Sequence, residues 1–259
     1  MANILEELSA LRREDAEKLA AVEPLETLET VIGDLSPVRS FPAAFAREGV
    51  NVIAELKKAS PSKGLIRADF HPLLLAPELE KAGAAALSVL CEPHRFLGGE
   101  AYLRAVRGTV DIPILYKDFV TTRYQIARAR AAGADAVLLI VASLSQKELA
   151  ELVAVADEYG IVSFVETHTA EEIEIAVDAG AKAIGVNCRD LKTFHTDPSI
   201  TAELIGKIPH DRVRIAESGI RNADDIDLLI KAGAQGFLIG ETLMRGERPG
   251  ETLAGLIRR

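Results

Sequence analysis

Apolar segments alternate with amphipathic segments along most of this 259-residue chain. Four apolar segments follow one pattern, in which a helix ends at a glycine and a strand begins two or three residues later: "KAGAAALSVL" (81–90), "AAGADAVLLI" (131–140), "DAGAKAIGVN" (178–187) and "KAGAQGFLIG" (231–240). Glycine suits this helix end because it tolerates the left-handed conformation that commonly follows a last helical turn. Further apolar strands are predicted at 51–57, 112–117, 161–166 and 212–217.

The amphipathic stretches between these strands predict helices. They lie at about 73–82, 100–107, 122–132, 146–159, 170–179, 199–206, 223–232 and 250–258. Strands that alternate with helices form parallel sheets from βαβ units. Eight such units in roughly 200 residues are typical of a closed (β/α)8 TIM barrel. An open doubly wound sheet is the alternative, but no G-x-G-x-x-G follows the first strand. The sequence therefore predicts an α/β protein of the barrel class.

Residues 1–48 precede the first predicted strand and form an N-terminal helical extension. "NILEELSALRREDAEKLAAV" has apolar residues at helical spacing, and "SPVRSFPAAFAREG" resembles a second short helix after a proline-bounded turn. We expect a single domain over 1–259, with the barrel at 49–259. The sequence alone favours an extension that plugs the bottom of the barrel, and a flap near its mouth is the alternative.

Composition limits the classes of function. The chain is 48% hydrophobic and 27% charged, which suits a globular protein with a sizeable core. It has no apolar run near the ~18–20 residues of a membrane span and no apolar signal-peptide core. Its two cysteines lack metal-ligand spacing, so we expect a reducing cytoplasm. A net charge of −9 without a basic block argues against nucleic acid but leaves an anionic small ligand open.

The stretch "AELKKASPSKG" (54–64) places ionisable groups where the first strand runs into its loop. Side chains alternate between the two sides of a strand, so Glu55 and Lys57 share one face and Lys58 takes the other. If Glu55 points into the barrel, Lys57 does as well. This predicts an acid and a base side by side at the barrel mouth, with Lys58 solvated outside.

Polar residues close other predicted strands too. They are Lys117, Glu166, Asn187 (with Arg189 two positions further on) and Glu217 followed by Ser218. A single charged residue at a strand end is usually a solvated loop residue. The whole set falls at the ends of apolar runs and not at their starts, and barrels of this kind carry catalytic groups at those ends. The set therefore predicts a functional cavity.

The loops after the last two strands, "AESGIR" and "IGETLM", predict a phosphate site. Such loops bind phosphate in many barrels, with the N-terminus of a short extra helix. Gly219 and Gly240 permit a close backbone approach and Ser218 offers a hydroxyl, although the glycines also suit tight turns alone. We expect Glu241 to point away from the anion. "ASPSKG" adds Ser60 to the rim in a mobile loop.

These motifs together resemble a known family. The segments "VIAELKKASPSKG", "LSVLCEPHRFLGG", "PILYKDFV", "GADAVLLIVASL", "FVETHT", "IGVNCRDL", "IAESGI" and "GFLIGETLM" occur in the order and spacing of the indole-3-glycerol phosphate synthase family of tryptophan biosynthesis. The resemblance implies a (β/α)8 barrel whose extension lies over the mouth. It also implies a carboxy-lyase that converts 1-(2-carboxyphenylamino)-1-deoxyribulose 5-phosphate to indole-3-glycerol phosphate, CO2 and water, without a metal or organic cofactor.

The resemblance also implies catalytic roles. Lys117 is the general acid that protonates the ketone oxygen as the ring closes. Lys57 engages the substrate carboxylate or phosphate and is a candidate for the dehydration. Glu166 stabilises the developing iminium and helps to remove the hydroxyl or a proton. Glu55 and Asn187 orient the lysines and the substrate.

The resemblance implies substrate contacts as well. Phosphate or ribulose contacts are implied for Ser60, Ser218, Gly219 and Gly240, and Arg189 and Glu217 belong around the same site. Phe96 and Phe119 match aromatic positions that flank the anthranilate ring. The chain departs from the family pattern at Cys91, Tyr116, Thr167 and Cys188. None of these is a catalytic position, and by alternation Tyr116 faces away from Lys117.

Two other functions compete with the synthase. One is a sibling barrel such as phosphoribosylanthranilate isomerase, which depends on an Asp/Cys pair, whereas this chain offers Glu55 with Lys57. The other is a non-catalytic barrel that binds a phosphate ligand and would not need two lysines and a carboxylate base. Nothing in the sequence indicates an apolar interface, so a monomer is the default expectation.

Overall fold

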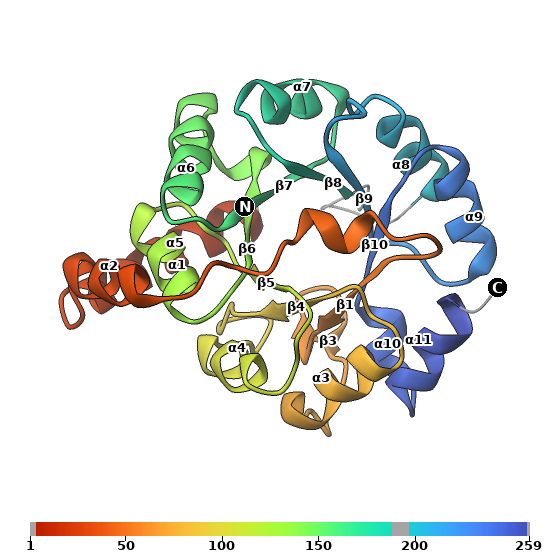
Figure 1. Cartoon of the computed structure of the whole chain (residues 1–259), viewed down its shortest axis with the longest axis horizontal. Coiled ribbons are helices and arrows are strands. Elements are labelled where there is room, and N and C mark those ends of the chain that lie inside the picture. The colour runs from red at the N-terminus through yellow and green to blue at the C-terminus, as the bar shows by residue number, and fades with distance from the viewer. Residues whose placement is uncertain (1–3, 188–196, 258–259) are drawn as a thin grey trace.

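The protein is a closed parallel β barrel surrounded by helices (Figure 1). The computed structural model describes residues 4–187 and 197–257. Within these ranges eight strands close the barrel in the order β1-β10-β9-β8-β7-β6-β5-β4. They are β1 (Val52–Leu56), β4 (Ala86–Leu90), β5 (Ile114–Lys117), β6 (Ala136–Ile140), β7 (Val162–Thr167), β8 (Ala183–Asn187), β9 (Val213–Glu217) and β10 (Gly236–Ile239). The predicted (β/α)8 fold is confirmed, and the open doubly wound sheet is wrong.

The outer helices lie where the amphipathic pattern predicted them. They are α3 (Pro72–Lys81), α4 (Glu100–Arg107), α5 (Arg123–Ala131), α6 (Gln146–Glu158), α7 (Ala170–Asp178), α8 (Pro198–Ile205), α9 (Ala223–Lys231) and α11 (Pro249–Ile257). In each repeated unit, the glycine that follows the helix has a left-handed backbone. Its φ is +106° at Gly83, +94° at Gly133, +86° at Gly180 and +102° at Gly233. These glycines end the helices and redirect the chain into the next strand, as the repeat predicted.

The N-terminal part of the chain differs in detail from the prediction. The first predicted helix is α1 (Ile4–Ala20). A second helix, α2 (Leu25–Asp34), was not predicted, whereas the helix predicted around residue 42 is a single turn, η1 (Pro42–Phe45). The boundary between an extension at 1–48 and a barrel at 49–259 within one domain stays a prediction.

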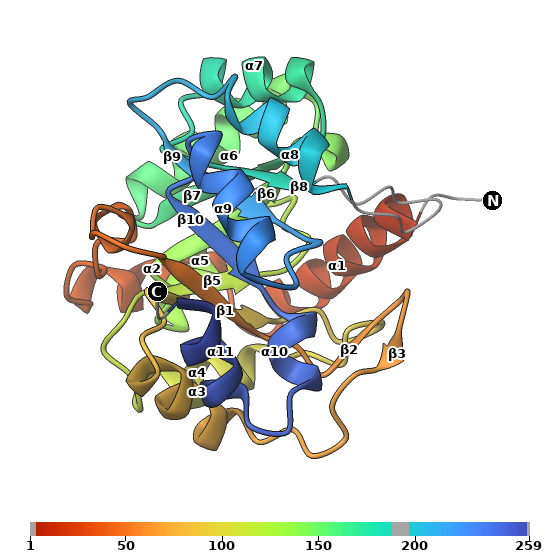
Figure 2. The same ribbon diagram turned by 90° about the vertical axis from the view of Figure 1, so that its right-hand side faces the viewer.

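The N-terminal segment packs at both ends of the barrel. The ring of Phe45 lies against Gly236, the first residue of β10, where an added Cβ would be 2.6 Å from Phe45 Cδ1. Phe41 is fully buried and contacts Phe164 edge-on inside the barrel. In Figure 2, α1 lies at the opposite end, beside the hairpin of β2 (Ala59–Ser60) and β3 (Gly64–Leu65). The predicted bottom plug is therefore correct for η1 and wrong for α1, which covers the mouth.

The side-chain alternation in β1 separates the two cores of the protein. Ile53 packs in the apolar cluster inside the barrel, and Ala54 and Leu56 pack between the strands and the helices. Glu55 and Lys57 consequently project inward at the strand's carboxyl end, where both line a pocket. Two short helical segments, η2 (Val141–Ser143) and α10 (Glu241–Arg245), follow β6 and β10. None of the described helices is long and apolar enough to cross a membrane.

Candidate active site

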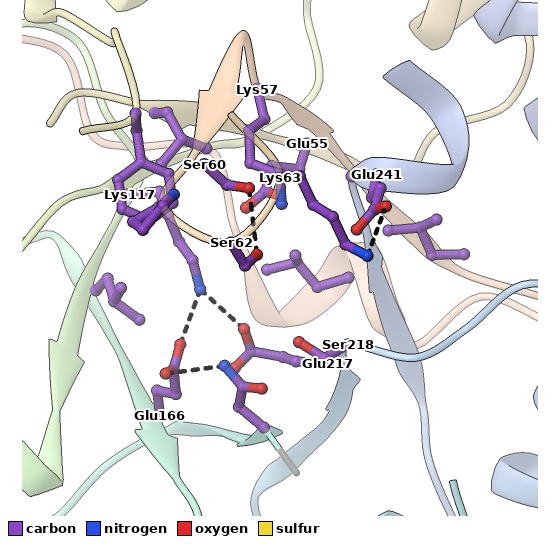
Figure 3. Close-up of a pocket in the computed structure, with 18 of the residues that line it drawn as sticks. Glu55, Lys57, Ser60, Ser62, Lys63, Lys117, Glu166, Glu217, Ser218 and Glu241 are labelled. Atoms are coloured by element: carbon purple, nitrogen blue, oxygen red, sulfur yellow. Dashed lines mark hydrogen bonds and ion pairs between the residues drawn. The ribbon is translucent and has the colours of Figure 1, made fainter. Parts of the chain in front are cut away.

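A pocket of about 510 Å³ opens at the carboxyl ends of the barrel strands (Figure 3). All predicted site residues that the structure describes line it: Glu55, Lys57, Ser60, Phe96, Lys117, Phe119, Glu166, Asn187, Glu217, Ser218, Gly219 and Gly240. Arg189, together with the departure at Cys188, lies outside the described residues. Side chains from distant parts of the chain are thus brought together by the barrel, as the strand-end pattern predicted.

Lys117 is the centre of the site. Its Nζ donates to Glu166 Oε2 at 2.9 Å and to Glu217 Oε2 at 2.8 Å, as Figure 3 shows. The three residues lie at the ends of β5, β7 and β9, and their side chains are at most 13% exposed. Burial works against the charged ammonium, but the negative charges of Glu166, Glu217 and Glu55 outweigh it and raise the pKa of Lys117. Lys117 is therefore held as a charged ammonium that donates hydrogen bonds to both carboxylates.

The two carboxylates that bind Lys117 differ in their affinity for a proton. Burial raises the pKa of Glu217 to about 7, and the negative charge of Glu166 adds to this effect. Burial acts on Glu166 in the same sense, but the positive charges of Lys117 and His168, with hydrogen bonds from Lys117 and Asn187, lower its pKa to about 2. Two carboxyl groups whose pKa values are pushed apart are suited to different acid–base roles.

The barrel wall leaves room for Glu217 because β8 carries a glycine opposite it. A Cβ on Gly185 would lie 2.2 Å from Glu217 Oε1 and 2.6 Å from Phe164 Cζ. Glu217 Oε1 is buried, and no described residue forms a hydrogen bond with it. A buried oxygen without a donor favours the neutral acid, which agrees with the raised pKa of Glu217.

Glu55 and Lys57 form the predicted pair on the inner face of β1. Lys57 Nζ lies 2.5 Å from Glu55 Oε2, and the lysine and glutamate side chains are 13% and 4% exposed. A Cβ on Gly240 would be 2.0 Å from Glu55 Oε2. Gly240 was predicted for its close approach to an anion. The structure gives it a second reason, which is to leave space for the Glu55 carboxylate.

Two aromatic rings form one wall of the pocket. The ring centroids of Phe96 and Phe119 are 6.1 Å apart with the planes tilted by 44°. The loop that carries Phe96 is organised by Glu92, a fully buried carboxylate that accepts hydrogen bonds from the backbone N–H groups of His94, Arg95 and Phe96 at 2.6–2.8 Å. Phe96 therefore lies on a loop whose backbone is tied to a buried carboxylate.

The opposite wall is formed by the turns after β9 and β10. Ser218 and Gly219 both have left-handed backbones, with φ of +60° and +73°. This conformation strains a serine, and such strain is concentrated at functional sites. The short helix α10 begins directly after Gly240. Glu241 was expected to point away from the pocket. Instead it lines the pocket and pairs with Lys63 Nζ at 3.9 Å (Figure 3). It also pairs with Arg245 Nε at 3.0 Å.

Sequence reasoning missed two parts of the site. His168 lines the pocket beside Glu166, and its position two residues after Glu166 was the available signal, because such residues share a strand face. Arg12 on α1 is paired with Asp118, the residue after Lys117, across 106 positions of the chain. No local pattern in the sequence could reveal that contact.

The departures from the family pattern that lie in the described residues all face away from the pocket. The hydroxyl of Tyr116 donates to Asp118 Oδ2 at 3.1 Å, and that of Thr167 donates to the Gly185 carbonyl oxygen at 2.8 Å. Cys91 is buried, and burial raises the pKa of its thiol. In the parts of the chain that the structure describes, no group of three or more His, Cys, Asp and Glu side chains could hold a metal ion.

Comparison with known proteins agrees with the geometry. The family model described as indole-3-glycerol phosphate synthase matches residues 5–256. The indole-3-glycerol phosphate synthase of Alkaliphilus metalliredigens is 44% identical over 254 residues, which cover 98% of this chain and 97% of the relative. That of Streptomyces griseus is 44% identical over 256 residues, with coverages of 98% and 95%.

A solved structure supports the fold alone. Orotidine 5'-phosphate decarboxylase from Pyrococcus horikoshii superposes with a TM-score of 0.61 at 13% identity, covering 79% of this chain and 96% of that one. The family match and the two relatives extend over nearly the whole chain. The chain belongs to the indole-3-glycerol phosphate synthase family.

Proposed function

We propose that this protein converts 1-(2-carboxyphenylamino)-1-deoxyribulose 5-phosphate to indole-3-glycerol phosphate, CO2 and water, the reaction of its family. The observation that carries the proposal is the Lys117 ammonium, held between Glu166 and Glu217 in a pocket with an aromatic wall. A site that only bound a ligand would not need a buried acid between two carboxylates of such different pKa.

Lys117 acts as the general acid in ring closure. The ring carbon that bears the carboxylate attacks the ketone carbon, and the ketone oxygen takes a proton from Lys117 Nζ and becomes a hydroxyl. This attack is slow unless the oxygen is protonated, and a positioned acid contributes about 10²–10⁴-fold to such a step. CO2 then leaves, and its bonding electrons restore the aromatic ring.

Glu166 and Glu217 serve different stages of the reaction. Glu166 is ionised and can stabilise the iminium that develops on the substrate nitrogen and accept a proton during dehydration. Glu217, with a pKa of about 7, can hold a proton near neutral pH and exchange it with Lys117 through their 2.8 Å hydrogen bond. Lys57, oriented by Glu55, is placed to bind the substrate carboxylate and to assist the loss of the hydroxyl. Asn187 orients Glu166 through a 3.1 Å hydrogen bond.

The remaining pocket residues hold the flexible substrate at its two ends. Phe96 and Phe119 flank the anthranilate ring. Ser60, Ser218, Gly219 and Gly240 contact the phosphate or ribulose, and cationic side chains of the same pocket, including Lys63, Arg221 and Arg245, add positive charge. Arg189 is proposed from the sequence to join them. Holding both ends turns ring closure into a reaction of pre-positioned groups.

We also propose that the protein works as a monomer in the cytoplasm, on a small phosphorylated substrate and without a nucleic-acid partner. Support for the monomer is that one chain supplies the acidic, basic and aromatic side chains of the pocket. The net charge of −9 supports the absence of nucleic acid. Size-exclusion chromatography with light scattering should give a mass near 27.8 kDa, and a doubled mass would refute the monomer.

The proposed activity is tested by incubating the purified protein with the carboxyphenylamino substrate and following the fluorescence of the indole product. Phosphoribosylanthranilate serves as the parallel substrate. Indole formation from the first and no conversion of the second supports the synthase. Conversion of phosphoribosylanthranilate alone would favour the isomerase, and binding without turnover would favour the ligand-binding barrel.

A further inference from the structure

The imidazole of His168 lies between two carboxylates. Its Nε2 is 3.5 Å from Glu166 Oε1 and its Nδ1 is 3.3 Å from Glu172 Oε2. The side chain is 16% exposed and lines the pocket, and Nε2 is buried without a hydrogen-bond acceptor among the described residues. Neither the strand-end pattern nor the family resemblance assigned this residue a role.

We propose that His168, as an imidazolium held by Glu172, is a positioning residue that holds the ionised Glu166 carboxylate in its orientation towards Lys117. The proposal rests on the function proposed for Glu166. It extends the site into an ordered row of opposite charges, Glu172, His168, Glu166 and Lys117, that runs from the start of α7 to the centre of the pocket.

The oxygens of Glu166 show what His168 contributes. Oε2 accepts from the Lys117 ammonium at 2.9 Å, and Oε1 accepts from the Asn187 amide at 3.1 Å. His168 is the charged group that faces Oε1. Without it, Oε1 would keep only the neutral Asn187 donor, and the carboxylate would be held less firmly in place.

The surroundings of His168 favour its protonated form. The charged groups that face it in the described part of the chain are Glu166 from β7, Glu172 from α7 and Glu217 from β9. Burial opposes the charge, but these carboxylates outweigh it and raise the pKa of His168 above its ordinary value of 6.5. All three partners are acidic, so the imidazole is enclosed by negative charge.

Glu172 offers a variant that separates charge from structure. Its Oε2 also accepts the backbone N–H of His168 at 2.6 Å, and its own N–H donates to Thr169 Oγ1 at 3.2 Å at the start of α7. The amide oxygen of a glutamine can still accept the backbone N–H. Glu172→Gln therefore keeps the helix start but removes the charge that supports the imidazolium. Glu172 is absent from the pocket lining, so it makes no substrate contact there.

The test compares four forms of the whole 259-residue chain: wild type, Glu172→Gln, Glu171→Gln and His168→Gln. Glu171 is the matched control because it is exposed in the same helical turn and loses the same charge. The imidazole of His168 is titrated by NMR, with its signals assigned by their loss in His168→Gln. Steady-state kinetics are measured from about pH 5.5 to about pH 9 on the same samples, a range that spans the ordinary pKa of a histidine.

We expect wild-type His168 to titrate above pH 6.5 and Glu172→Gln to lower that pKa by about one pH unit. The rate should fall as pH rises through the His168 pKa, because deprotonation removes the positive charge beside Glu166. This alkaline limb should move to lower pH in Glu172→Gln and stay in place in Glu171→Gln. His168→Gln should lose about tenfold in kcat near neutral pH with KM little changed, and should lack the limb.

Three results would overturn the role of His168. They are a wild-type His168 pKa at or below 6.5, an unshifted pKa in Glu172→Gln, or equal kinetic shifts in Glu171→Gln and Glu172→Gln. A wild-type protein that makes no indole product would overturn the proposed function, and the catalytic part of this proposal with it. The NMR titration does not depend on activity, so the two failures are distinguishable.

Discussion

Arg12 and Asp118 form a bidentate, buried ion pair that joins α1 to the residue next to Lys117. Arg12 Nε lies 2.9 Å from Asp118 Oδ1 and Nη2 lies 2.7 Å from Oδ2, with side-chain exposures of 10% and 0%. Tyr116 donates a further hydrogen bond to the same carboxylate. The helix that covers the mouth is thus anchored to the residue that follows Lys117.

Removal of Arg12 should destabilise the protein strongly. Arg12→Ala leaves the Asp118 carboxylate buried without its charged partner, which typically costs about 3–5 kcal/mol. Arg13→Ala is the matched control, because Arg13 is half exposed and lies 3.9 Å from the exposed Glu148. Urea unfolding should show a large loss for Arg12→Ala and a change within about 0.5 kcal/mol for Arg13→Ala. If both variants lost the same free energy of unfolding, the buried Arg12–Asp118 pair would contribute no more to stability than an exposed ion pair.

Glu217 should make the stability of the protein depend on pH. Burial raises its pKa from 4.5 to about 7, so folding takes up a proton between these values. Stability from this group is fully present below about pH 4.5, and is lost as pH rises towards 7. Relative to Glu217→Gln, the wild type should lose roughly 2–3 kcal/mol between about pH 4.5 and about pH 7.5. Parallel curves for the two proteins in denaturant unfolding would contradict the raised pKa.

Gly185→Ala should disturb the centre of the site without touching the substrate pocket directly. The added methyl group would sit 2.2 Å from Glu217 Oε1 and must displace that carboxylate from Lys117. We expect kcat to fall by about 10–100-fold and stability by about 1–3 kcal/mol. Gly33→Ala is the control, since a Cβ there has no neighbour within 4 Å in the described structure. A normal rate for Gly185→Ala would show that the exact position of Glu217 is unimportant.

Replacement by alanine should impair the enzyme at Lys57 but not at Lys58. Lys57 lines the pocket and pairs with Glu55, whereas Lys58 does not line the pocket. Lys57→Ala should raise KM and lower kcat, each by about tenfold or more, because a charged contact to the substrate is lost. Lys58→Ala should behave like the wild type in the same assay. An unchanged KM in Lys57→Ala would remove Lys57 from substrate binding.

The barrel could be predicted well from the sequence because its signals are local. Each repeated unit ends its helix at a glycine that needs a left-handed backbone, and each strand is a short apolar run, so the boundaries follow from neighbouring residues. Glu55 and Lys57 could be assigned to one face of β1 by strand alternation alone, because residues two apart point the same way. The N-terminal segment was harder. Its amphipathic pattern predicted α1 but could not show that α1 and η1 lie at opposite ends of the barrel.

The parts of the site that were not predicted depend on contacts between distant elements. The pairing of Arg12 with Asp118 and the space that Gly185 leaves for Glu217 exist only once the barrel is closed. The opposite pKa shifts of Glu166 and Glu217 likewise follow from burial and from which neighbours each carboxylate meets. His168 was within reach of the alternation rule, but a histidine next to a strand end is not distinctive by itself.

The role of Lys117 is tested most directly by Lys117→Ala, with single-turnover rates of indole formation and the dissociation constant of the substrate measured on the same sample. We expect the rate to fall by a factor of about 100 or more, while the dissociation constant changes by less than about tenfold. Circular dichroism would verify that the variant is folded. A folded Lys117→Ala protein that closes the ring at the wild-type rate would contradict a general acid at the centre of this pocket.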